Sequence, residues 1–445
     1  MTEAQHRIAR CLLLVLAAAQ CAVAAADESL RIDLGTALRL ADERNLDVAI
    51  YYQRVAAASA TLAESRLLAV PTLTVGTDSD RHHGTLQETS GVVDDVDRAS
   101  RFTGAGATLA VDIAAAIYRP LAARQNLDAV RASATVNRHR VLLEVATAYL
   151  ALLQAQATVR VADAALERAN DLAALTANYA QTGEGLQADA EMAAVQPLLW
   201  QQQQLAARAN AEAAAAAVAS LLHLDRGARL TPVEEAVPSL ELYADGQDLD
   251  RLIDQALQGR PERDQLDALF AAAENDLKAQ RYGLFIPRVG LAYSSGEFGG
   301  APGSGIANTA HRDDLALQLY WQFDAVGLGH RTKVNAREAE LRQIGLERDK
   351  LHDAIVAEVR TAYAGVQSQR GQLPLTDAAV RHAAEAYELQ RERIYDQQGL
   401  PLEAQTAMQA LAAAELARID ALVGYDLAQI RLHTALGNPL EKVNP

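Results

Sequence analysis

Hydrophobic and polar residues alternate without interruption in the segment DLALQLYWQFD, residues 314–324. Its apolar positions are Leu315, Leu317, Leu319, Trp321 and Phe323. A period of two predicts a β-strand with one apolar face. The surrounding sequence is rich in Ala, Gln, Glu and Arg, which is typical of long helices. The pattern therefore predicts an apolar-faced strand in a mainly helical chain.

Three further segments, 72–80, 103–112 and 288–294, alternate in a similar way. Their predicted lipid-facing residues are Leu109, Val111, Val289 and Leu291. The segments are 7 to 10 residues long, close to the roughly 9–11 residues that a tilted strand needs to cross a bilayer. The segments between paired strands, 81–100 and 296–312, are polar and are predicted to be long loops.

Two interpretations of these strands remain open. Amphipathic hairpins packed on a soluble core would show the same alternation. If the strands instead span lipid, four of them cannot close a barrel, and open edges in hydrocarbon leave backbone groups unpaired. A lipid-spanning chain must therefore oligomerise.

An internal repeat organises the chain. Four motifs recur after 212–216 residues: EVATAY (144–149) as EVRTAY (358–363), YAQTGEGLQA (179–188) as YDQQGLPLEA (395–404), Pro71 as Pro287, and Asp112 as Asp324. Composition bias explains matched alanines but not matched Tyr, Gly, Pro and Asp. The expected divisions are a signal peptide (1–26), a first repeat (27–230), a linker (231–248), a second repeat (249–440) and a C-terminal tail (441–445).

Each repeat has the same predicted order of elements. A moderate helix (35–69 or 249–285) precedes two strands, a very long helix, a glycine turn and a returning helix. No Gly or Pro occurs from 121 to 182, which predicts a rod roughly 90 Å long. The second rod, 331–398, contains Gly371 and Pro374, where we expect a kink. Wide apolar faces on these Ala-rich helices favour packing against neighbours on both sides, as in coiled coils.

The N-terminus resembles an export signal. Arg7 and Arg10 precede an apolar run that ends in small residues, so cleavage after Ala26 is expected. An uncleaved signal anchor and lipidation at Cys21 are the alternatives. Cleavage would remove Cys11 and Cys21, the only cysteines, leaving no disulfide. Beyond the signal we expect no transmembrane helix.

Charge and composition narrow the function. The chain has 41 basic and 57 acidic residues, a net charge of −16, which argues against nucleic acid and for cationic or neutral partners. His82 and His83 lack further ligands at metal-binding spacing. His223 and His433, at the ends of the returning helices, are interpreted as capping or packing residues. We expect no cofactor and no enzymatic activity, since no catalytic motif stands out.

On its ordered repeats, the chain resembles the TolC-like outer-membrane factors of the outer membrane efflux protein family. The resemblance implies a mainly α fold with a small β part. Three copies would share one outer-membrane β-barrel, with four strands from each, above a periplasmic α-barrel and an equatorial belt. It implies a passive exit duct of a tripartite efflux pump or type I secretion system. The partners would be a periplasmic adaptor (membrane fusion protein) and an inner-membrane pump, of the resistance-nodulation-division (RND) or ABC class. The alternative is a soluble periplasmic coiled-coil scaffold.

The resemblance also implies that the two helical hairpins end in periplasmic tips that dock the adaptor. The candidate tip residues are Tyr179, Gln181, Gly183, Glu184, Asp189, Tyr395, Gln397, Gly399, Pro401 and Glu403. Packing between hairpins is the alternative role for the Tyr and Gln residues.

The sequence departs from the family's acidic entrance. An Asp commonly lies six residues after each tip glycine, and another lies nine after the second. Here Asp189 occupies the first position, but Gln405 and Met408 stand at the other two. We therefore expect a different entrance, with Glu184 or Glu403 supplying negative charge.

Overall fold

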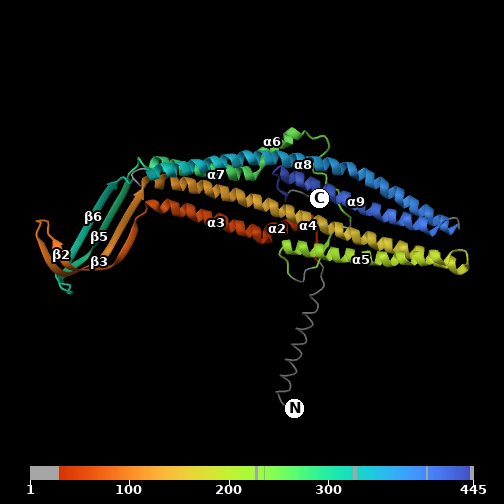
Figure 1. The fold of residues 1–445 in the computed structure, drawn as a ribbon, viewed down its shortest axis with the longest axis horizontal. Coiled ribbons are helices and arrows are strands. Elements are labelled where there is room, and N and C mark those ends of the chain that lie inside the picture. The colour runs from red at the N-terminus through yellow and green to blue at the C-terminus, as the bar shows by residue number, and fades with distance from the viewer. Residues whose placement is uncertain (1–29, 226–228, 235, 324–327, 397–398, 441–445) are drawn as a thin grey trace, which may run out of the picture. The chain divides into compact units, whose positions relative to one another are not determined.

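The structure is a computed structural model that describes residues 30–225, 229–234, 236–323, 328–396 and 399–440. It consists of helices and two sheets (Figure 1). The chain forms two compact units: unit 1 contains residues up to Tyr52, 134–261 and 352 onward, and unit 2 contains 53–133 and 262–351. Each unit thus takes segments from both sequence repeats. The predicted signal peptide and both cysteines lie outside the described residues.

Unit 2 contains one four-stranded antiparallel sheet with the order β2-β3-β5-β6. Its strands are β2 (Thr72–Gln87), β3 (Val93–Asp112), β5 (Arg288–Pro302) and β6 (Ala310–Tyr320). The prediction of long loops at 81–100 and 296–312 is therefore wrong. Only 88–92 and 303–309 separate the paired strands, because backbone pairing continues beyond the point where apolar alternation stops. His82 and His83 lie in β2.

The helices of unit 2 are the C-terminal part of α3 (Leu46–Arg66), the N-terminal part of α4 (Ile113–Thr182), α7 (Pro261–Gly283) and the N-terminal part of α8 (Leu328–Tyr395). Helices α7 and α8 are joined by Arg281–Glu338 and Arg348–Asp267, both 2.7 Å. The Arg348 guanidinium also lies 5.0 Å from the centroid of the Phe270 ring, a favourable cation–π distance.

The opening helix of each repeat is broken, which the sequence prediction missed. Helix α2 (Leu34–Arg44) ends at Asn45, and α6 (Leu249–Gly259) ends at Arg260. The Asn45 side chain accepts a hydrogen bond from Asp47 N at 2.9 Å and so starts α3. Pro261 begins α7, a position where the missing N–H costs nothing.

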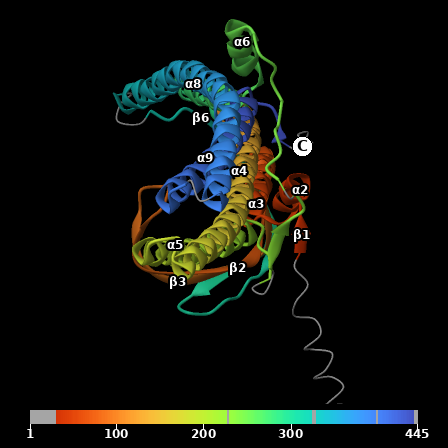
Figure 2. The ribbon, with the colours of Figure 1, turned by 90° about the vertical axis from the view of Figure 1, so that its right-hand side faces the viewer.

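Unit 1 contains the C-terminal parts of α4 and α8 together with the returning helices α5 (Gln187–Leu221) and α9 (Pro401–Ala435) (Figures 1 and 2). Its core includes Leu38 from α2, Leu142 and Leu152 from α4, Val218 from α5 and Ile430 from α9. A short parallel pair, β1 (Leu30–Ile32) with β4 (Leu230–Pro232), was not predicted. It brings the start of the chain against the segment that links the repeats.

Helix α9 also holds part of the linking segment through buried polar groups. The fully buried Asp426 accepts a hydrogen bond from Leu240 N at 2.8 Å. The buried Gln429 accepts one from Tyr243 N at 3.0 Å. These side chains accept hydrogen bonds from backbone N–H groups of a segment that forms no helix or strand at these residues.

The long helices run continuously. Helix α4 includes Pro120, and α8 runs unbroken through Gly371 and Pro374, where the kink stays a prediction. By length and composition, α4 contains an 18-residue window apolar enough to cross a membrane, with mean hydropathy 1.3. Half of that window is buried within the protein, so packing accounts for its apolar character.

Candidate functional site

One face of the sheet in unit 2 is apolar, and strand register explains why. The register places predicted lipid-facing residues directly opposite one another: Leu109, Leu291 and Leu317 in one row, and Val111, Val289 and Leu319 in the next. Residues opposite one another in a sheet share a face. Patterns found separately in three strands therefore combine into one continuous surface.

This apolar face is open to the surroundings. Leu315 and Leu317 are each 73% exposed, and in β2 Leu73 is 77% and Val75 83% exposed. Contiguous apolar surface of this kind marks a contact with lipid or with another chain.

The opposite face is built mostly from small and polar residues, with Phe102 and Phe298 paired on it. Gly104 and Gly296 are paired in register there, and a Cβ added to either would lie 2.3 Å from a carbonyl oxygen of the neighbouring strand. Only glycine permits this approach of the two backbones. Gln318 and Ala316 also have the parity of this face, so it suits water better than lipid.

Two aromatic residues lie outside the strand that was predicted to contain them. Strand β6 ends at Tyr320, so Trp321 and Phe323 follow it, and Asp324 is outside the described residues. Trp321 is 50% and Phe323 58% exposed. The Trp321 indole N–H donates to Phe285 O at 3.4 Å, which ties the end of β6 to the segment before β5.

The first hairpin tip, between α4 and α5, is closed by two glycines. Gly183 has φ +81°, a left-handed conformation that suits glycine. The Gly185 N–H donates to Tyr179 O at 2.9 Å, six residues back. The Glu184 N–H donates to the same oxygen at 3.0 Å, five residues back. The 6→1 bond, with Gly183 in the left-handed conformation, is typical of a helix C-cap. Leu186 then takes an extended conformation and α5 begins at Gln187.

The second tip repeats the six-residue hydrogen bond and the extended residue before the returning helix, which corrects the sequence alignment. The Gly399 N–H donates to Arg393 O at 2.9 Å, and the extended Leu400 precedes α9 at Pro401. By geometry Gly399 corresponds to Gly185, whereas alignment of residue identities pairs it with Gly183. The dipeptide Gly-Leu, present at both tips, was the signal for this register.

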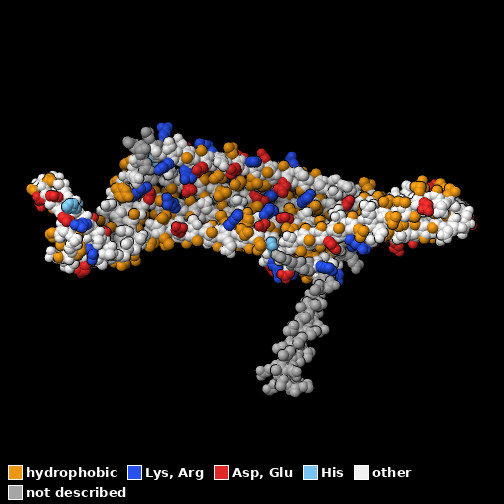
Figure 3. All heavy atoms as spheres, turned by 60° about the horizontal axis from the view of Figure 1, so that its bottom comes forward, with side chains coloured by type: hydrophobic (Ala, Val, Ile, Leu, Met, Phe, Trp, Pro, Cys, Tyr) orange, Lys and Arg blue, Asp and Glu red, His pale blue; other side chains and the backbone are white. Residues whose placement is uncertain are grey.

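The two tips touch each other in unit 1. The Tyr179 hydroxyl donates to Tyr395 O at 3.3 Å, while the Tyr395 side chain is 60% exposed. A groove of about 240 Å³ between the tips is lined by Tyr179, Glu184, Asp189, Ile394 and Pro401, among others. Exposed leucines flank it, at Leu186, Leu400 and Leu402. Figure 3 shows hydrophobic side chains over this part of the hairpins.

The charges at the tips differ from an acidic ring. Glu403 pairs with Arg393 at 3.1 Å, so part of its charge is neutralised within the chain. Gln405 is 4% exposed and Met408 fully buried. A carboxylate at either position would face the protein interior, which explains uncharged residues there. Gln181 is exposed, and Gln397 lies outside the described residues.

Other polar candidates have structural roles. His223 follows α5 with φ +48°, and His433 Nδ1 lies 2.9 Å from the Tyr243 hydroxyl. Burial lowers the pKa of His433, which favours the neutral ring. Among the described residues, no group of three or more His, Cys, Asp or Glu side chains could hold a metal ion.

Solved structures with the same fold cover almost the whole chain. The outer-membrane channel OprN is 19% identical with a TM-score of 0.78, over 92% of this chain and 90% of that one. The channel CmeC of Campylobacter jejuni is 15% identical with a TM-score of 0.77, over 93% and 87%. The outer membrane protein VceC of Vibrio cholerae is 17% identical with a TM-score of 0.74, over 91% and 96%. A comparison with curated proteins finds no match. The fold is therefore that of the outer-membrane channels.

The sequence places the chain more closely. Residues 252–438, nearly all of the second repeat, match the family described as outer membrane efflux protein. Together, this match and the shared fold confirm the predicted resemblance to the TolC-like outer-membrane factors.

Proposed function

We propose that the protein is a passive exit duct of the outer membrane, through which an efflux pump or a type I secretion system exports its cargo. The observation that carries this function is the exposed apolar face shared by four strands. A bilayer covers such a face while water fills the side with glycine and polar residues. The family match and the outer-membrane channels of the same fold support the location.

Closure of the barrel requires further copies of the chain. Among the described residues, β2 pairs only with β3 and β6 only with β5, so each outer edge carries unpaired backbone groups. In hydrocarbon each such group costs several kcal/mol. Three copies would contribute about 12 strands, an even number within the usual range for outer-membrane barrels. A homotrimer removes both edges.

The hairpin tips are the proposed docking site for a periplasmic adaptor. Their exposed leucines and Tyr395 offer apolar contacts, and Glu184, Asp189 and Glu403 offer carboxylates. The adaptor would connect the duct to an inner-membrane pump of the RND or ABC class, which supplies energy and direction. The duct contributes a wetted path and no catalytic step. The chain's net charge of −16 favours cationic or neutral cargo.

Cell fractionation tests the duct against a soluble periplasmic coiled-coil scaffold. We expect the mature protein in the outer-membrane fraction, extracted only by detergent and trimeric by light scattering. A soluble scaffold would have no cover for Leu315 and Leu317. Recovery of a monomer in the periplasmic fraction without detergent would overturn the proposal.

A further inference from the structure

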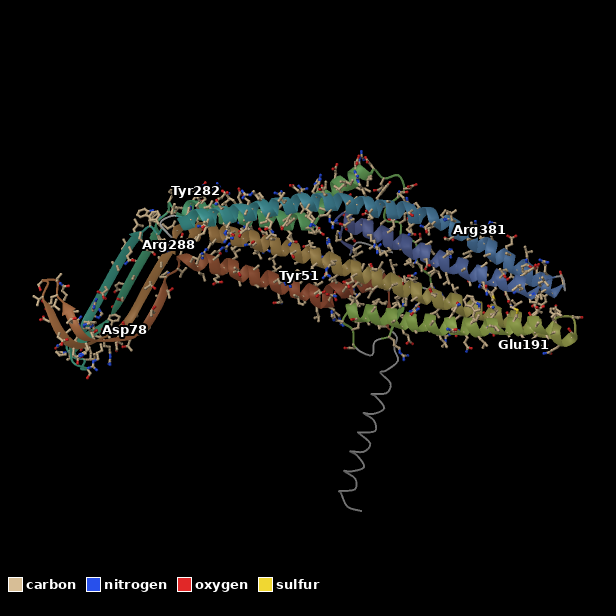
Figure 4. The ribbon with its side chains drawn as sticks, viewed as in Figure 1. Tyr51, Asp78, Glu191, Tyr282, Arg288 and Arg381 are labelled. Atoms are coloured by element: carbon tan, nitrogen blue, oxygen red, sulfur yellow. The ribbon has the colours of Figure 1, made fainter. Side chains whose placement is uncertain are left out.

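A polar cavity of about 340 Å³ lies in unit 2 where helices meet strands. Its walls come from the end of β3, the first turns of α4, the end of α7, the start of β5 and the first turns of α8. Figure 4 shows Arg288, one of its lining residues, at this junction near Tyr282. All of the lining segments belong to the same compact unit.

The cavity concentrates positive charge in an acidic chain. Its charged lining residues are four permanent cations, Arg119, Arg288, Lys333 and Arg337, against two carboxylates, Asp112 and Asp276. His330 also lines it. The whole chain carries a net charge of −16, so this local excess is opposite to the protein's average.

The two carboxylates do not balance these cations, since Asp112 pairs with Arg288 and Asp276 is the one other carboxylate lining the cavity. Asp112 accepts from Arg288 Nε at 3.2 Å and also caps α4 by accepting from Ala115 N at 3.0 Å. Burial raises the pKa of Asp276, an effect that the charges of Arg337 and Arg119 oppose and that of Glu340 reinforces. The Arg337 guanidinium reaches Glu340 at 2.6 Å, where both side chains are about half exposed, so solvent screens that pair.

The position of the cavity suggests what enters it. Asp112 is the last residue of β3 and Arg288 the first of β5, so the cavity lies where the sheet begins. Ala114 and Ala115 line it and belong to the first turn of α4, where the helix dipole favours anions. Exposed aromatic side chains occur nearby in the chain, at Tyr282, Phe285 and Trp321. Such aromatics gather at the level of lipid headgroups.

We propose that this cavity binds a phosphate group at the boundary between the membrane and the periplasm. Arginine forks match phosphate oxygens in pairs, and basic pockets at this depth bind lipid headgroups. The phosphate belongs either to a phospholipid of the periplasm-facing leaflet or to a solute. The inference rests on the proposed duct, which sets the level of the membrane.

The test uses the full-length protein in detergent with two probes, short-chain phosphatidylglycerol and inorganic phosphate. The variant is Arg119→Gln with Arg337→Gln. The matched control is Arg124→Gln with Arg342→Gln, which removes the same charge from α4 and α8 outside the cavity lining. Binding is followed by native mass spectrometry and by the shift of the melting temperature.

We expect the cavity variant to bind a probe about tenfold more weakly or worse, because two charge-assisted contacts are lost, while the control binds like wild type. Loss for the lipid alone identifies a headgroup, and loss for inorganic phosphate identifies a solute. Equal binding by variant and control, or no binding to wild type, overturns the site. Trimer and membrane fraction are measured on the same samples, so failure of the duct itself would be seen separately.

Discussion

Tyr149 and Tyr363 make the same hydrogen bond at equivalent places in the two repeats. The Tyr149 hydroxyl lies 2.9 Å from Ile32 O, and the Tyr363 hydroxyl donates to Gln247 O at 3.0 Å. Each carbonyl immediately precedes an aspartate that N-caps a short helix, Asp33 for α2 or Asp248 for α6. The repeated motif EVxTAY therefore serves to anchor the start of each repeat on its long helix.

Removing either hydroxyl should destabilise the protein without affecting location. Tyr149→Phe and Tyr363→Phe should each cost about 0.5–1.5 kcal/mol, and Tyr149→Phe should cost more because its hydroxyl also contacts the Glu234 carboxylate. Melting temperatures of the purified protein measure the effect. The control is Tyr52→Phe, since Tyr52 is 58% exposed. A melting temperature unchanged in both variants would contradict the anchoring role.

Buried Asp426 should make stability depend on pH. Burial raises its pKa from 3.8 to about 7, so the folded protein holds the proton more tightly than the unfolded chain. Its stability contribution is complete below about pH 4 and is lost as the pH rises through 7, at about 1.4 kcal/mol per pH unit between the two pKa values. Asp426→Asn should reduce the fall in melting temperature between pH 5 and 8. Asp420→Asn, an exposed neighbour on α9, should not. Identical pH profiles for Asp426→Asn and wild type would refute the assignment.

The two faces of β6 should respond oppositely to charge. Leu317→Arg places a cation on the apolar face and should cost about 2–4 kcal/mol near the bilayer midplane. Gln318→Arg adds the same charge on the other face and should be tolerated. The amount of trimer in the outer membrane measures both. If the two variants assemble equally well, the assignment of lipid and water faces is wrong.

The second tip should tolerate no side chain at its glycine. A Cβ on Gly399 would lie 2.9 Å from Ile394 N, whereas one on Gly371 in α8 would meet nothing within 4 Å. Gly399→Ala should therefore distort the tip and impair export while trimers remain in the membrane, and Gly371→Ala should export normally. Drug susceptibility in cells lacking other ducts measures export. Normal export by Gly399→Ala would remove this tip from the docking surface.

The alternation of apolar residues at Leu315, Leu317 and Leu319 predicted one apolar face of the sheet, because successive side chains of a strand point to opposite faces. It failed where strands continue with polar residues on both faces, as at His82 and His83. The break at Asn45 was missed because no Gly or Pro marks it, although Pro261 marks its counterpart. Helix α8 accommodates Pro374 without a break, as a long helix packed on neighbours can. At the tips, alignment of residue identities paired Gly183 with Gly399. The hydrogen bonds show that Gly185 is the residue equivalent to Gly399.

The two outer edges of the sheet are unlike, since one belongs to β2 and the other to β6. In a closed ring each β2 must meet the β6 of the next copy, a head-to-tail contact. A chain whose β6 edge is blocked by proline would still join through β2 and would interrupt the ring. Such a mutant should be dominant over wild type. In an equal mixture, only about one in eight of the three-copy rings would contain intact copies alone.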